Sequence, residues 1–482
     1  MDKRFWVGLA LANPLRLVIP VILLVLAGRT SNTDAQTETI LYSFVGSTND
    51  GSSPNGLVQG RDGNFYGTTS SGGTSNAGTV FRISPSGTHT TLYSFVGSPS
   101  DGSGPNGLVQ GSDGNFYGTA GGGTSNAGTV FRISPSGSET NLYSFGSVPN
   151  DGRYLVAGLV QGSDGNFYGA TEYGGTNNYG TVFRISPSGS YTNLHSFVDY
   201  PTDGRYPQAG LVQGSDGNFY GTTAYGGTLG IPDIGDGSVF RISPNGSETT
   251  LYSFGGLSND GILPRANLVQ GSDGNFYGTT VIGGTTWGGT VFQISPSGSY
   301  TSLYSFGSSP GDGGNPQAAL VQGSDGNFYG IAEYGGTNGV GTVFRISPSG
   351  AYTNLYSFGG SPSDGGSPAS LVQGSDGNLY GTTYGGGTSN DGVVFKLTVR
   401  LNPPANQISE IQFFNVQDST IVALPIPSVA GETYQLQYTD SMSPTNWLNT
   451  GGTFTSIGGP LVLIDLAEPL PPQRFYRAVI TP

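Results

Sequence analysis

The stretch "LVQGSDGNFYG" at residues 108–118 decides the fold, because the chain repeats it. Near-copies stand at 57–67, where Arg61 replaces Ser, and at 371–381, where Leu379 replaces Phe. Unchanged copies stand at 159–169, 211–221, 268–278 and 320–330. Seven copies in one chain predict a folding unit repeated seven times, so a specific function is expected where the copies differ.

The whole repeat is longer than this stretch. The motif "LYSF" or "LHSF" recurs at spacings of 50 to 57 residues between 41 and 355, a period typical of propellers and solenoids. Each unit contains four strand-like pieces, for example "GLVQG", "NFYGT", "GTVFRIS" and "TNLYSF". The Asp-Gly pair between the first two pieces predicts a hairpin with a type I′ turn. No helical periodicity follows residue 36, so the pattern predicts an all-β, seven-bladed β-propeller.

The two ends of the repeat array are complementary. Residues 37–44, "TETILYSF", form a lone fourth piece before the first "GLVQG". The last unit ends after its third piece, "GVVFKLT", at 392–398. The N-terminal strand is therefore expected to complete the last blade and close a ring. A solenoid would instead need distinct polar caps, so closure favours the propeller.

The N-terminus predicts a signal peptide over residues 1–35. Lys3 and Arg4 precede an apolar segment at 17–27, and a small-x-small cleavage pattern follows at 33–35. The alternative is an uncleaved membrane anchor. Prolines and an arginine leave the apolar run shorter than the roughly 20 residues that a span needs. We therefore expect a secreted protein, extracellular or at the cell surface, with no membrane span in the mature chain.

The composition changes after "NPP" at 402–404. We expect the propeller to occupy residues 36–400 and a small C-terminal domain to occupy 401–482. The pieces "TIVALPIP", "TYQLQYT", "LVLIDL" and "RFYRAVI" alternate apolar and polar residues. This pattern predicts an immunoglobulin- or fibronectin-like β-sandwich, with Trp447 in its core.

Charge and cysteine content exclude several classes of function. The formal net charge is −14, and nucleic-acid binding needs a basic face that this chain lacks, so no nucleic-acid partner is expected. With no cysteine, the chain forms no disulfide and offers no thiolate to a metal or a substrate. The 27 tyrosines and 25 phenylalanines supply the buried area that a chain so rich in glycine needs in order to fold.

Two histidines and many carboxylates are the candidates for chemistry. His89 and His195 occur in different copies, and each replaces a residue of the repeat, so both are interpreted as substitutions rather than ligands. Two histidines without cysteine do not make a typical zinc site, and we expect no metal, cofactor or catalytic residue. Calcium at the Asp-rich loops is conceivable, but no EF-hand spacing is present.

The carboxylates divide into recurrent and unequal ones. Recurrence in every unit predicts turns rather than catalysis for Asp50, Asp101, Asp151, Asp203, Asp260, Asp312 and Asp364. The unequal acids are Glu172, Glu333, Asp233, Asp236 and Asp391. They leave open a propeller glycoside hydrolase or polysaccharide lyase, which would use paired loop carboxylates.

A basic residue recurs in the third piece of most units. It is Arg82, Arg132, Arg184, Arg241 or Arg345, with Gln293 and Lys396 as variants. One interpretation is a ligand contact. The other is a structural partner for the turn aspartates Asp62, Asp113, Asp164, Asp216, Asp273, Asp325 and Asp376. Recurrence favours the structural role, because every blade must satisfy its polar groups.

The pattern "LYSF…DG…P…GLVQGSDGNFYGTT…YGGT…GTVFRISPSG" resembles the Gloeo-Verruco (GloVer) tandem repeat of secreted bacterial proteins, over about residues 41–398. The tail, with "YQLQYTDSMSPTNW" and "RFYRAVI", is similar to C-terminal β-sandwich modules of such proteins. The resemblance implies export, varied C-terminal sorting anchors and no established catalytic activity. Unlike the anchored members, this chain is expected to have no terminal apolar helix with a basic stop.

Variation among the copies should collect on one face. In a four-stranded blade, the loop into the first strand and the loop between the second and third strands emerge together. The "SDGN" and "SPSG" turns, nearly uniform, should lie opposite. Tyr154 and Tyr206 are among the variable residues. The proposed ligand contacts are Tyr173, Tyr179, Tyr225, Trp287, Tyr334, Tyr384, Arg153 and Arg205.

Exposed aromatic and arginine side chains suit a polysaccharide or a cell-surface protein. The sequence therefore predicts a secreted, non-enzymatic propeller that binds such a ligand through its variable loops. Two alternatives remain beside it: the carbohydrate-cleaving enzyme above, and a purely structural surface or matrix protein, for which loop variation would be drift.

Overall fold

A computed structural model describes most of residues 36–398 and six segments of the C-terminal part. In the first part the described residues are 36–48, 50–199, 203–227, 236–257, 259–309, 311–360, 362 and 364–398. In the second they are 412–416, 419–428, 433–439, 448–455, 459–467 and 475–481. The expected signal peptide at 1–35, Asp233 and Trp447 lie outside the described residues.

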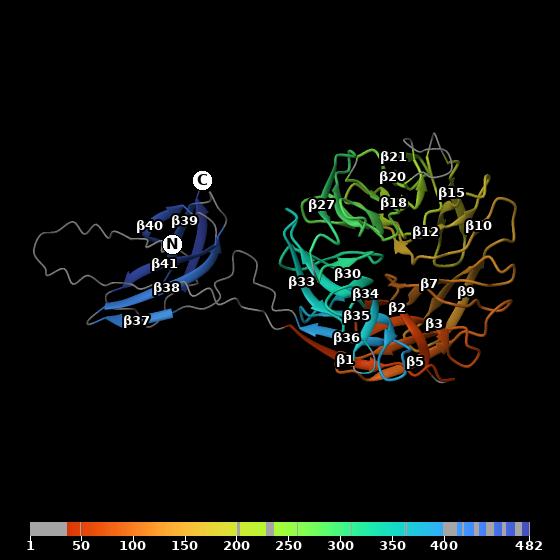
Figure 1. Ribbon diagram of the computed structural model, residues 1–482, viewed down its shortest axis with the longest axis horizontal. Helices are drawn as coiled ribbons and strands as arrows, with labels where there is room; N and C mark the ends of the chain where they lie inside the picture. Colours follow the sequence, from red (N-terminus) through yellow and green to blue (C-terminus); the bar gives the residue numbers. More distant parts are fainter. Residues whose placement is uncertain are drawn as a thin grey trace, which may run out of the picture. The chain divides into compact units, whose positions relative to one another are not determined.

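Residues 36–398 form seven four-stranded antiparallel sheets, which are the seven blades of a β-propeller. The blades follow one another around the ring in sequence order (Figure 1). None of the described residues is helical. In each blade the first strand of the repeat is innermost and the "LYSF" strand is outermost.

The first four blades are built from these strands. Blade 1 contains β2 (Gly51–Gln59), β3 (Phe65–Gly72), β4 (Thr79–Ile83) and β5 (His89–Ser94). Blade 2 contains β6 (Leu108–Gln110), β7 (Phe116–Ala120), β8 (Thr129–Ile133) and β9 (Glu139–Ser144). Blade 3 contains β11 (Val160–Gln161), β12 (Phe167–Thr171), β14 (Thr181–Ile185) and β15 (Tyr191–Ser196). Blade 4 contains β17 (Val212–Gln213), β18 (Phe219–Thr223), β20 (Ser238–Ile242) and β21 (Glu248–Ser253).

The remaining blades complete the ring. Blade 5 contains β23 (Val269–Gln270), β24 (Phe276–Thr280), β26 (Thr290–Ile294) and β27 (Tyr300–Ser305). Blade 6 contains β29 (Val321–Gln322), β30 (Phe328–Ala332), β32 (Thr342–Ile346) and β33 (Tyr352–Ser357). Blade 7 contains β34 (Gly365–Gln373), β35 (Leu379–Gly386), β36 (Val393–Thr398) and β1 (Thr37–Ser43).

Four short strand pairs extend blades 3 to 6 toward the variable loops. They are β10 (Gly152–Arg153) with β13 (Tyr173–Gly174), β16 (Gly204–Arg205) with β19 (Tyr225–Gly226), β22 (Gly261–Ile262) with β25 (Ile282–Gly283), and β28 (Gly313–Gly314) with β31 (Tyr334–Gly335).

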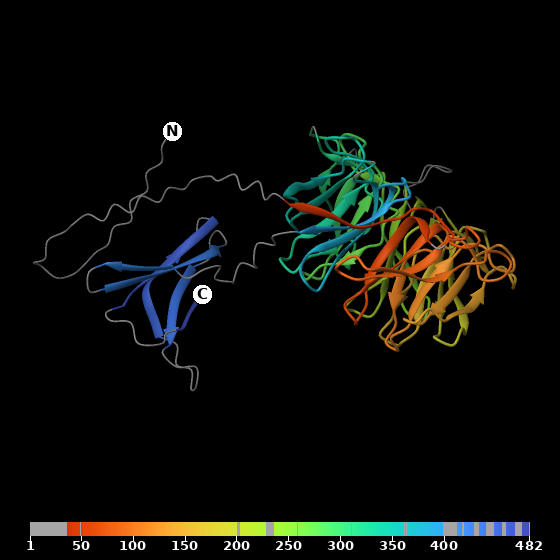
Figure 2. The ribbon, with the colours of Figure 1, turned by 90° about the horizontal axis from the view of Figure 1, so that it is seen from below.

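The N-terminal strand closes the ring as the sequence predicts. β1 pairs antiparallel with β36, with Thr37 opposite Thr398 and Ser43 opposite Val393. Figure 1 shows red β1 beside blue β36, and Figure 2 shows the same two strands together after a 90° turn. Without β1, the outer edge of β36 would carry unpaired backbone groups.

Aromatic stacking joins the blades. Tyr168 of blade 3 is buried, and its ring lies 3.9 Å from that of Phe219 in blade 4. The same stack closes the ring between Tyr380 of blade 7 and Phe65 of blade 1, at 4.1 Å. The glycine that follows the tyrosine is also explained, because a Cβ on Gly169 would lie 2.7 Å from a ring atom of Phe183. The most repeated residues therefore build the interfaces between blades.

The "SDGN" hairpin differs from the expected type I′ turn. Gly63 N donates to Gly60 O, and Gly60 N donates to Asn64 O, which makes a three-residue loop. Gly63 has a φ of 80°, but Asp62 is not among the residues with positive φ. The loop is thus a type I turn followed by a left-handed glycine. The physical reason is the Asp62 carboxylate, which accepts hydrogen bonds from Asn64 and Tyr66 and fixes the turn.

The two variants of the recurrent arginine have the structural role that recurrence favoured. Lys396 Nζ lies 3.1 Å from Asp376 Oδ2. Its variant Gln293 donates to Asp273 at 3.2 Å and to the Tyr277 hydroxyl at 2.7 Å.

A second ring of hydrogen bonds follows the inner strands. In each blade the backbone N–H at the "SDGN" serine, or at Arg61, donates to the glutamine of the next blade. The last of these bonds joins Ser375 N to Gln59 Oε1 at 2.8 Å and closes the circle. We call the end of the propeller that carries the "SDGN" turns the turn face. It is therefore held together by contacts that every copy supplies.

The described C-terminal strands form two three-stranded antiparallel sheets. One contains β37 (Gln412–Val416), β38 (Ser419–Ser428) and β41 (Gly459–Ala467). The other contains β40 (Leu448–Thr455), β39 (Thr433–Thr439) and β42 (Phe475–Thr481).

Candidate functional site

The two faces of the propeller carry different loops. The antiparallel order of each blade places the "SDGN" and "SPSG" turns at one end. The connecting loops between blades and the loops between second and third strands lie at the other end, which we call the variable-loop face. All eight predicted ligand contacts belong to the segments of this face.

A left-handed backbone position recurs in the connecting loops. The third residue after the recurrent aspartate has a positive φ in every copy: Ser53, Gly104, Tyr154, Tyr206, Leu263, Asn315 and Ser367. Its N–H donates to a carbonyl of the preceding blade, as Tyr206 N does to Tyr179 O at 2.8 Å. This bond fixes the conformation whatever the side chain is. A tyrosine there is strained relative to Gly or Asn, by about 1 kcal/mol.

Tyr154 and Tyr206 belong to a continuous group of tyrosines. Ring centroids lie 5.5 Å apart for Tyr154–Tyr173 and 5.0 Å apart for Tyr173–Tyr206. Tyr206 also lies 5.9 Å from Tyr179 and 6.0 Å from Tyr225. Tyr154 is 54% exposed, and the other four are half-buried. The rings therefore offer a surface that spans blades 3 and 4.

Arg205 lies among these rings. Its guanidinium carbon is 5.5 Å from the ring centroid of Tyr206 and about as far from Tyr179 and Tyr225, at 5.9 and 6.0 Å. Its Nη1 forms an ion pair with Asp199 at 2.9 Å. We name Tyr154, Tyr173, Tyr179, Arg205, Tyr206 and Tyr225 the tyrosine–arginine cluster. Arg153 is exposed and stands opposite Tyr173 in the β10–β13 pair, at the margin of this cluster.

The cluster perturbs one of its own hydroxyls. Partial burial and the neighbouring Glu172 carboxylate raise the pKa of Tyr173. Its phenol therefore stays protonated and able to donate a hydrogen bond.

Three predicted contacts lie in other blades. Trp287 belongs to blade 5 and is 69% exposed, Tyr334 to blade 6, and Tyr384 to blade 7. The structure thus brings together Tyr173, Tyr179, Tyr225 and Arg205, with Arg153 beside them, but not these three. Sequence reasoning ranked all eight equally, because position in a repeat does not say which loops meet.

Trp287 is unusual for its backbone. It has a φ of 64° at a position where other copies have Asn76, Asn126, Asn178, Gly339 or Asn390. Asn178 Oδ1 accepts a hydrogen bond from Gly174 N at 3.0 Å, and an indole cannot accept one. The tryptophan is therefore held at a position that favours asparagine.

The unequal acids that the structure describes do not form a pair, and Asp391 accepts a hydrogen bond from Ser52 at 2.7 Å. Glu172 accepts a hydrogen bond from Gln208 at 2.7 Å in blades 3 and 4. Glu333 binds Gln317 in blade 6. Asp236 has its pKa raised by burial and by Asp260. None of these arrangements brings two unequal acids together across a shared space.

The recurrent aspartates are structural, as their recurrence predicts. Each is buried and binds the aromatic residue of the preceding "LYSF" or "LHSF" strand. Tyr143 donates to Asp151 at 3.0 Å, and Tyr252 donates to Asp260 at 2.8 Å. His195 takes the tyrosine's place in blade 3 and lies 2.7 Å from Asp203.

A third residue completes each of these contacts from the next blade. It is the first or second residue of the outer strand, and it is Glu38, His89, Glu139, Tyr191, Glu248, Tyr300 or Tyr352. His89 stacks on Tyr42 at 4.0 Å, and Tyr300 stacks on Tyr252 at 4.1 Å. Both histidines are thus substitutions within the repeat, as expected. His89 lies at the start of β5 rather than in the preceding turn.

The glutamates at this third position have raised pKa values. Burial, together with a recurrent aspartate, raises the pKa to about 7 for Glu38, Glu139 and Glu248. Asp364, Asp101 and Asp203 are the respective neighbours. Two carboxylates between buried surfaces repel each other, so one of them retains its proton to higher pH.

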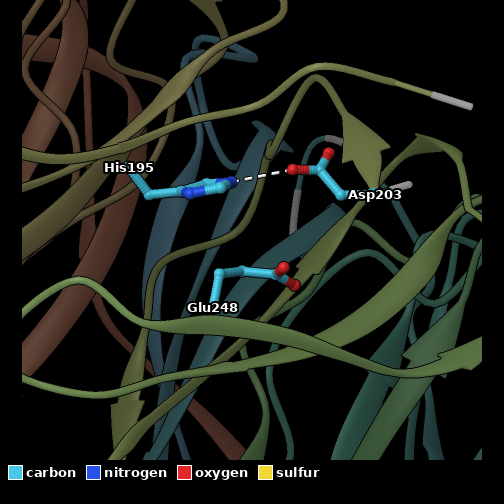
Figure 3. Close-up of side chains that lie close together, drawn as sticks. All are labelled: His195, Asp203 and Glu248. Atoms are coloured by element: carbon cyan, nitrogen blue, oxygen red, sulfur yellow. Dashed lines mark hydrogen bonds and ion pairs between the residues drawn. The ribbon is translucent and has the colours of Figure 1, made fainter.

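One of these groups has a composition found in no other copy. His195 Nε2, one Asp203 oxygen and one Glu248 oxygen all lie within 4.8 Å of one another. Figure 3 shows the three side chains pointing toward a common space, with the Glu248 carboxylate below the His195–Asp203 bond. It is the only such histidine–carboxylate group among the described residues that could hold a metal ion. Sequence reasoning missed it, because Glu248 comes from the next blade.

Comparison with known families identifies the repeat. The sequence profile described as "Gloeobacter/Verrucomicrobia repeat" matches residues 30–234 and again 212–438. No curated protein matches the chain.

No helix among the described residues is long and apolar enough to cross a membrane.

Two solved structures are similar to this chain at low identity. An ulvan lyase of a new polysaccharide lyase family, bound to -[GlcA(1-4)Rha3S]-, is 10% identical, with a TM-score of 0.44. The match covers 75% of this chain and 96% of the lyase. The BP39L lectin from Burkholderia pseudomallei is also 10% identical, with a TM-score of 0.46 over 69% of this chain and 95% of the lectin. Such distant likeness carries no argument about activity.

Proposed function

The chain belongs to the Gloeobacter/Verrucomicrobia repeat family, and on that scaffold we propose that it binds a polysaccharide through the tyrosine–arginine cluster, without cleaving it. The observation that carries the proposal is the strain at Tyr154 and Tyr206. Both occupy a left-handed position where the other five copies have Ser, Gly, Asn or, in blade 5, Leu263, and both meet the same group of rings. Residues kept against a local backbone preference concentrate at functional sites.

The chemistry of the cluster suits sugars. A sugar ring presents apolar C–H faces and hydroxyl edges, and tyrosine offers both an apolar ring and a hydroxyl. Arg205 and exposed Arg153 add charged hydrogen-bond donors. The cluster is open and spans two blades, which fits an extended chain better than a small molecule buried in a pocket.

The test begins with a glycan array probed with the full chain. A retained polysaccharide is then titrated against Tyr173→Ala, Tyr225→Ala and Tyr334→Ala. These tyrosines occupy the same repeat position in blades 3, 4 and 6, so Tyr334→Ala is the matched control. Each cluster variant should weaken binding about thirtyfold if it removes about 2 kcal/mol, and the control should bind like the native chain.

Two results would contradict the proposal. One is an equal loss of affinity in Tyr334→Ala and Tyr173→Ala, which would show that the polysaccharide does not bind at the cluster specifically. The other is retention of no glycan, which would favour a structural protein. Recovery of a shortened polysaccharide would replace binding with cleavage by the enzyme that the loop carboxylates suggested.

The same proposal includes export and a two-domain mature chain. Residues 1–35 act as a cleaved signal peptide, and the propeller lies outside the cell or on its surface. N-terminal sequencing of the protein from the culture medium should give a start at residue 36, or at 28 if cleavage follows Ala27. A start at Met1 in a membrane fraction would indicate an uncleaved anchor.

We also propose that residues 401–482 form an immunoglobulin- or fibronectin-like β-sandwich from the two three-stranded sheets. The propeller at 36–400 should then unfold cooperatively when it is expressed alone. Loss of that transition would show that the C-terminal part is integral to the propeller.

A further inference from the structure

We propose that His195, Asp203 and Glu248 bind a divalent transition-metal ion, with Zn²⁺ as the best match. The three donor atoms lie within 4.8 Å of one another, and the side chains converge from β15, the following connecting loop and β21 (Figure 3). This site shares no residue with the tyrosine–arginine cluster and does not depend on the proposed function.

The comparison among the seven copies carries the inference. Six copies place a tyrosine beside the recurrent aspartate, as Tyr93 lies 2.6 Å from Asp101. Only blades 3 and 4 combine a histidine, the aspartate and a glutamate. A neutral phenol is a poor ligand, whereas imidazole is the commonest protein ligand for transition metals. One substitution thus converts a structural contact into a set of three good donors.

The donor set selects the kind of metal. One nitrogen and two carboxylate oxygens suit Zn²⁺, whose catalytic sites combine His with Glu, and they suit Ca²⁺ poorly, because it takes six to eight oxygens. In a tetrahedral zinc site with bonds of about 2.0–2.2 Å, donor atoms lie about 3.3 Å apart. The His195–Asp203 distance of 2.7 Å must therefore lengthen slightly when an ion binds.

The surroundings orient these donors and leave a way in. Val198 N donates to the other oxygen of Asp203 at 3.3 Å, and Thr250 donates to Glu248 at 3.4 Å. Such outer contacts fix the orientation of carboxylate ligands. The Asp203 side chain is 4% exposed, but that of His195 is 21% exposed, so an ion can enter from the histidine side.

Two carboxylates also supply the charge that a dication needs. When a metal ion binds, it displaces the proton that the crowded carboxylates retain, and both acids then face the ion as carboxylates in a half-buried place. A divalent cation neutralises them, and a water molecule can take the remaining coordination position. In blade 1 the equivalent contact contains Tyr42, Asp50 and His89, with a single carboxylate, so that second histidine provides an internal control.

The repeat supplies substitutions that should fold. His195→Tyr and Glu248→Tyr each restore a residue that other copies carry at the same position. His89→Tyr does the same at the control position. The full chain, without a histidine tag, is titrated with ZnCl₂ by calorimetry, and its melting temperature is measured with and without a chelator.

The native chain and His89→Tyr should bind one Zn²⁺ and melt a few degrees higher with the metal in large excess over Kd. His195→Tyr and Glu248→Tyr should lose at least tenfold in affinity and show no shift. Co²⁺ should give tetrahedral d–d absorption in the native chain and none in His195→Tyr. An unchanged zinc response in His195→Tyr, its loss in His89→Tyr, or no binding by the native chain would each overturn the proposal.

Discussion

The turn face and the variable-loop face of this propeller are made by the same seven repeats, yet they use their residues differently. On the turn face, the same bonds recur in each blade, such as Tyr168 to Asp164 at 2.9 Å, and they hold the ring together. On the variable-loop face, Tyr154, Tyr206 and Trp287 stand where the backbone favours smaller residues. In a repeat protein, residues that are the same in all copies therefore identify the scaffold. Residues that differ from the other copies and are unfavourable for the local backbone identify the candidate site.

Removal of the ring closure should have the largest effect. A chain that lacks residues 36–43 exposes the edge of β36 and leaves blade 7 with three strands. We expect aggregation and loss of the cooperative melting transition, because an open edge pairs with other chains. Size-exclusion chromatography and calorimetry measure this, and a soluble monomer with native melting temperature would show that closure contributes little.

A buried tyrosine of the scaffold should come next. Tyr168→Ala removes both the stack on Phe219 and the bond to Asp164, and it should lower the free energy of unfolding by about 3–5 kcal/mol. Tyr173→Ala on the variable-loop face should change it by less than about 1 kcal/mol. Chemical denaturation of both variants tests the contrast between the faces. A larger loss of stability in Tyr173→Ala than in Tyr168→Ala would show that Tyr173 belongs to the scaffold and that Tyr168 does not.

The architecture could be predicted because its causes are local and repeated. The period and the missing fourth strand predict seven blades and the pairing of β1 with β36, and the structure confirms both. The predicted type I′ turn was wrong because the prediction used backbone preference alone. The carboxylate of Asp113, for example, accepts bonds from Asn115 and Tyr117 and stabilises a different loop.

The site could be predicted only in part, because it depends on contacts between blades. The sequence identifies Tyr173, Tyr225 and Arg205 as variable, but not that Tyr206 joins them. A signal was available in the third residue after each recurrent aspartate, where two copies have tyrosine and the others have Ser, Gly, Leu or Asn. No local pattern connects His195 to Glu248, because their contact depends on how neighbouring blades pack.

Trp287 offers a smaller and sharper test of the comparison. Trp287→Asn restores the residue common at this left-handed position, along with the acceptor for the N–H of Gly283. We expect the free energy of unfolding to rise by about 1 kcal/mol and the melting temperature by about 1–2 °C. Asn178→Trp in blade 3 is the reciprocal control and should lower both. Destabilisation by Trp287→Asn would show that the tryptophan serves the fold.

A further expected effect concerns pH. Burial and Asp101 raise the pKa of Glu139 from 4.5 to about 7 in the folded chain. The folded state thus binds the proton more tightly, so this contribution to stability is complete below about pH 4.5 and is lost as the pH rises through about 7. As the pH rises from about 5 to about 8, the free energy of unfolding of Glu139→Gln should therefore fall less than that of the native chain.

Melting temperatures across that range measure the difference. Glu139→Tyr, which carries the residue of blades 3, 5 and 6, should follow the glutamine variant. Parallel pH profiles for the native chain and both variants would show that this carboxylate does not titrate with folding.

The double variant Tyr154→Asn/Tyr206→Asn tests the central claim most directly, with affinity for a retained polysaccharide and melting temperature measured on the same samples. Both substitutions place a residue suited to the left-handed backbone, as Asn315 is in blade 6. The account predicts that binding is lost while the melting temperature stays the same or rises by about 2–4 °C. Unchanged binding, or a lower melting temperature, would contradict it.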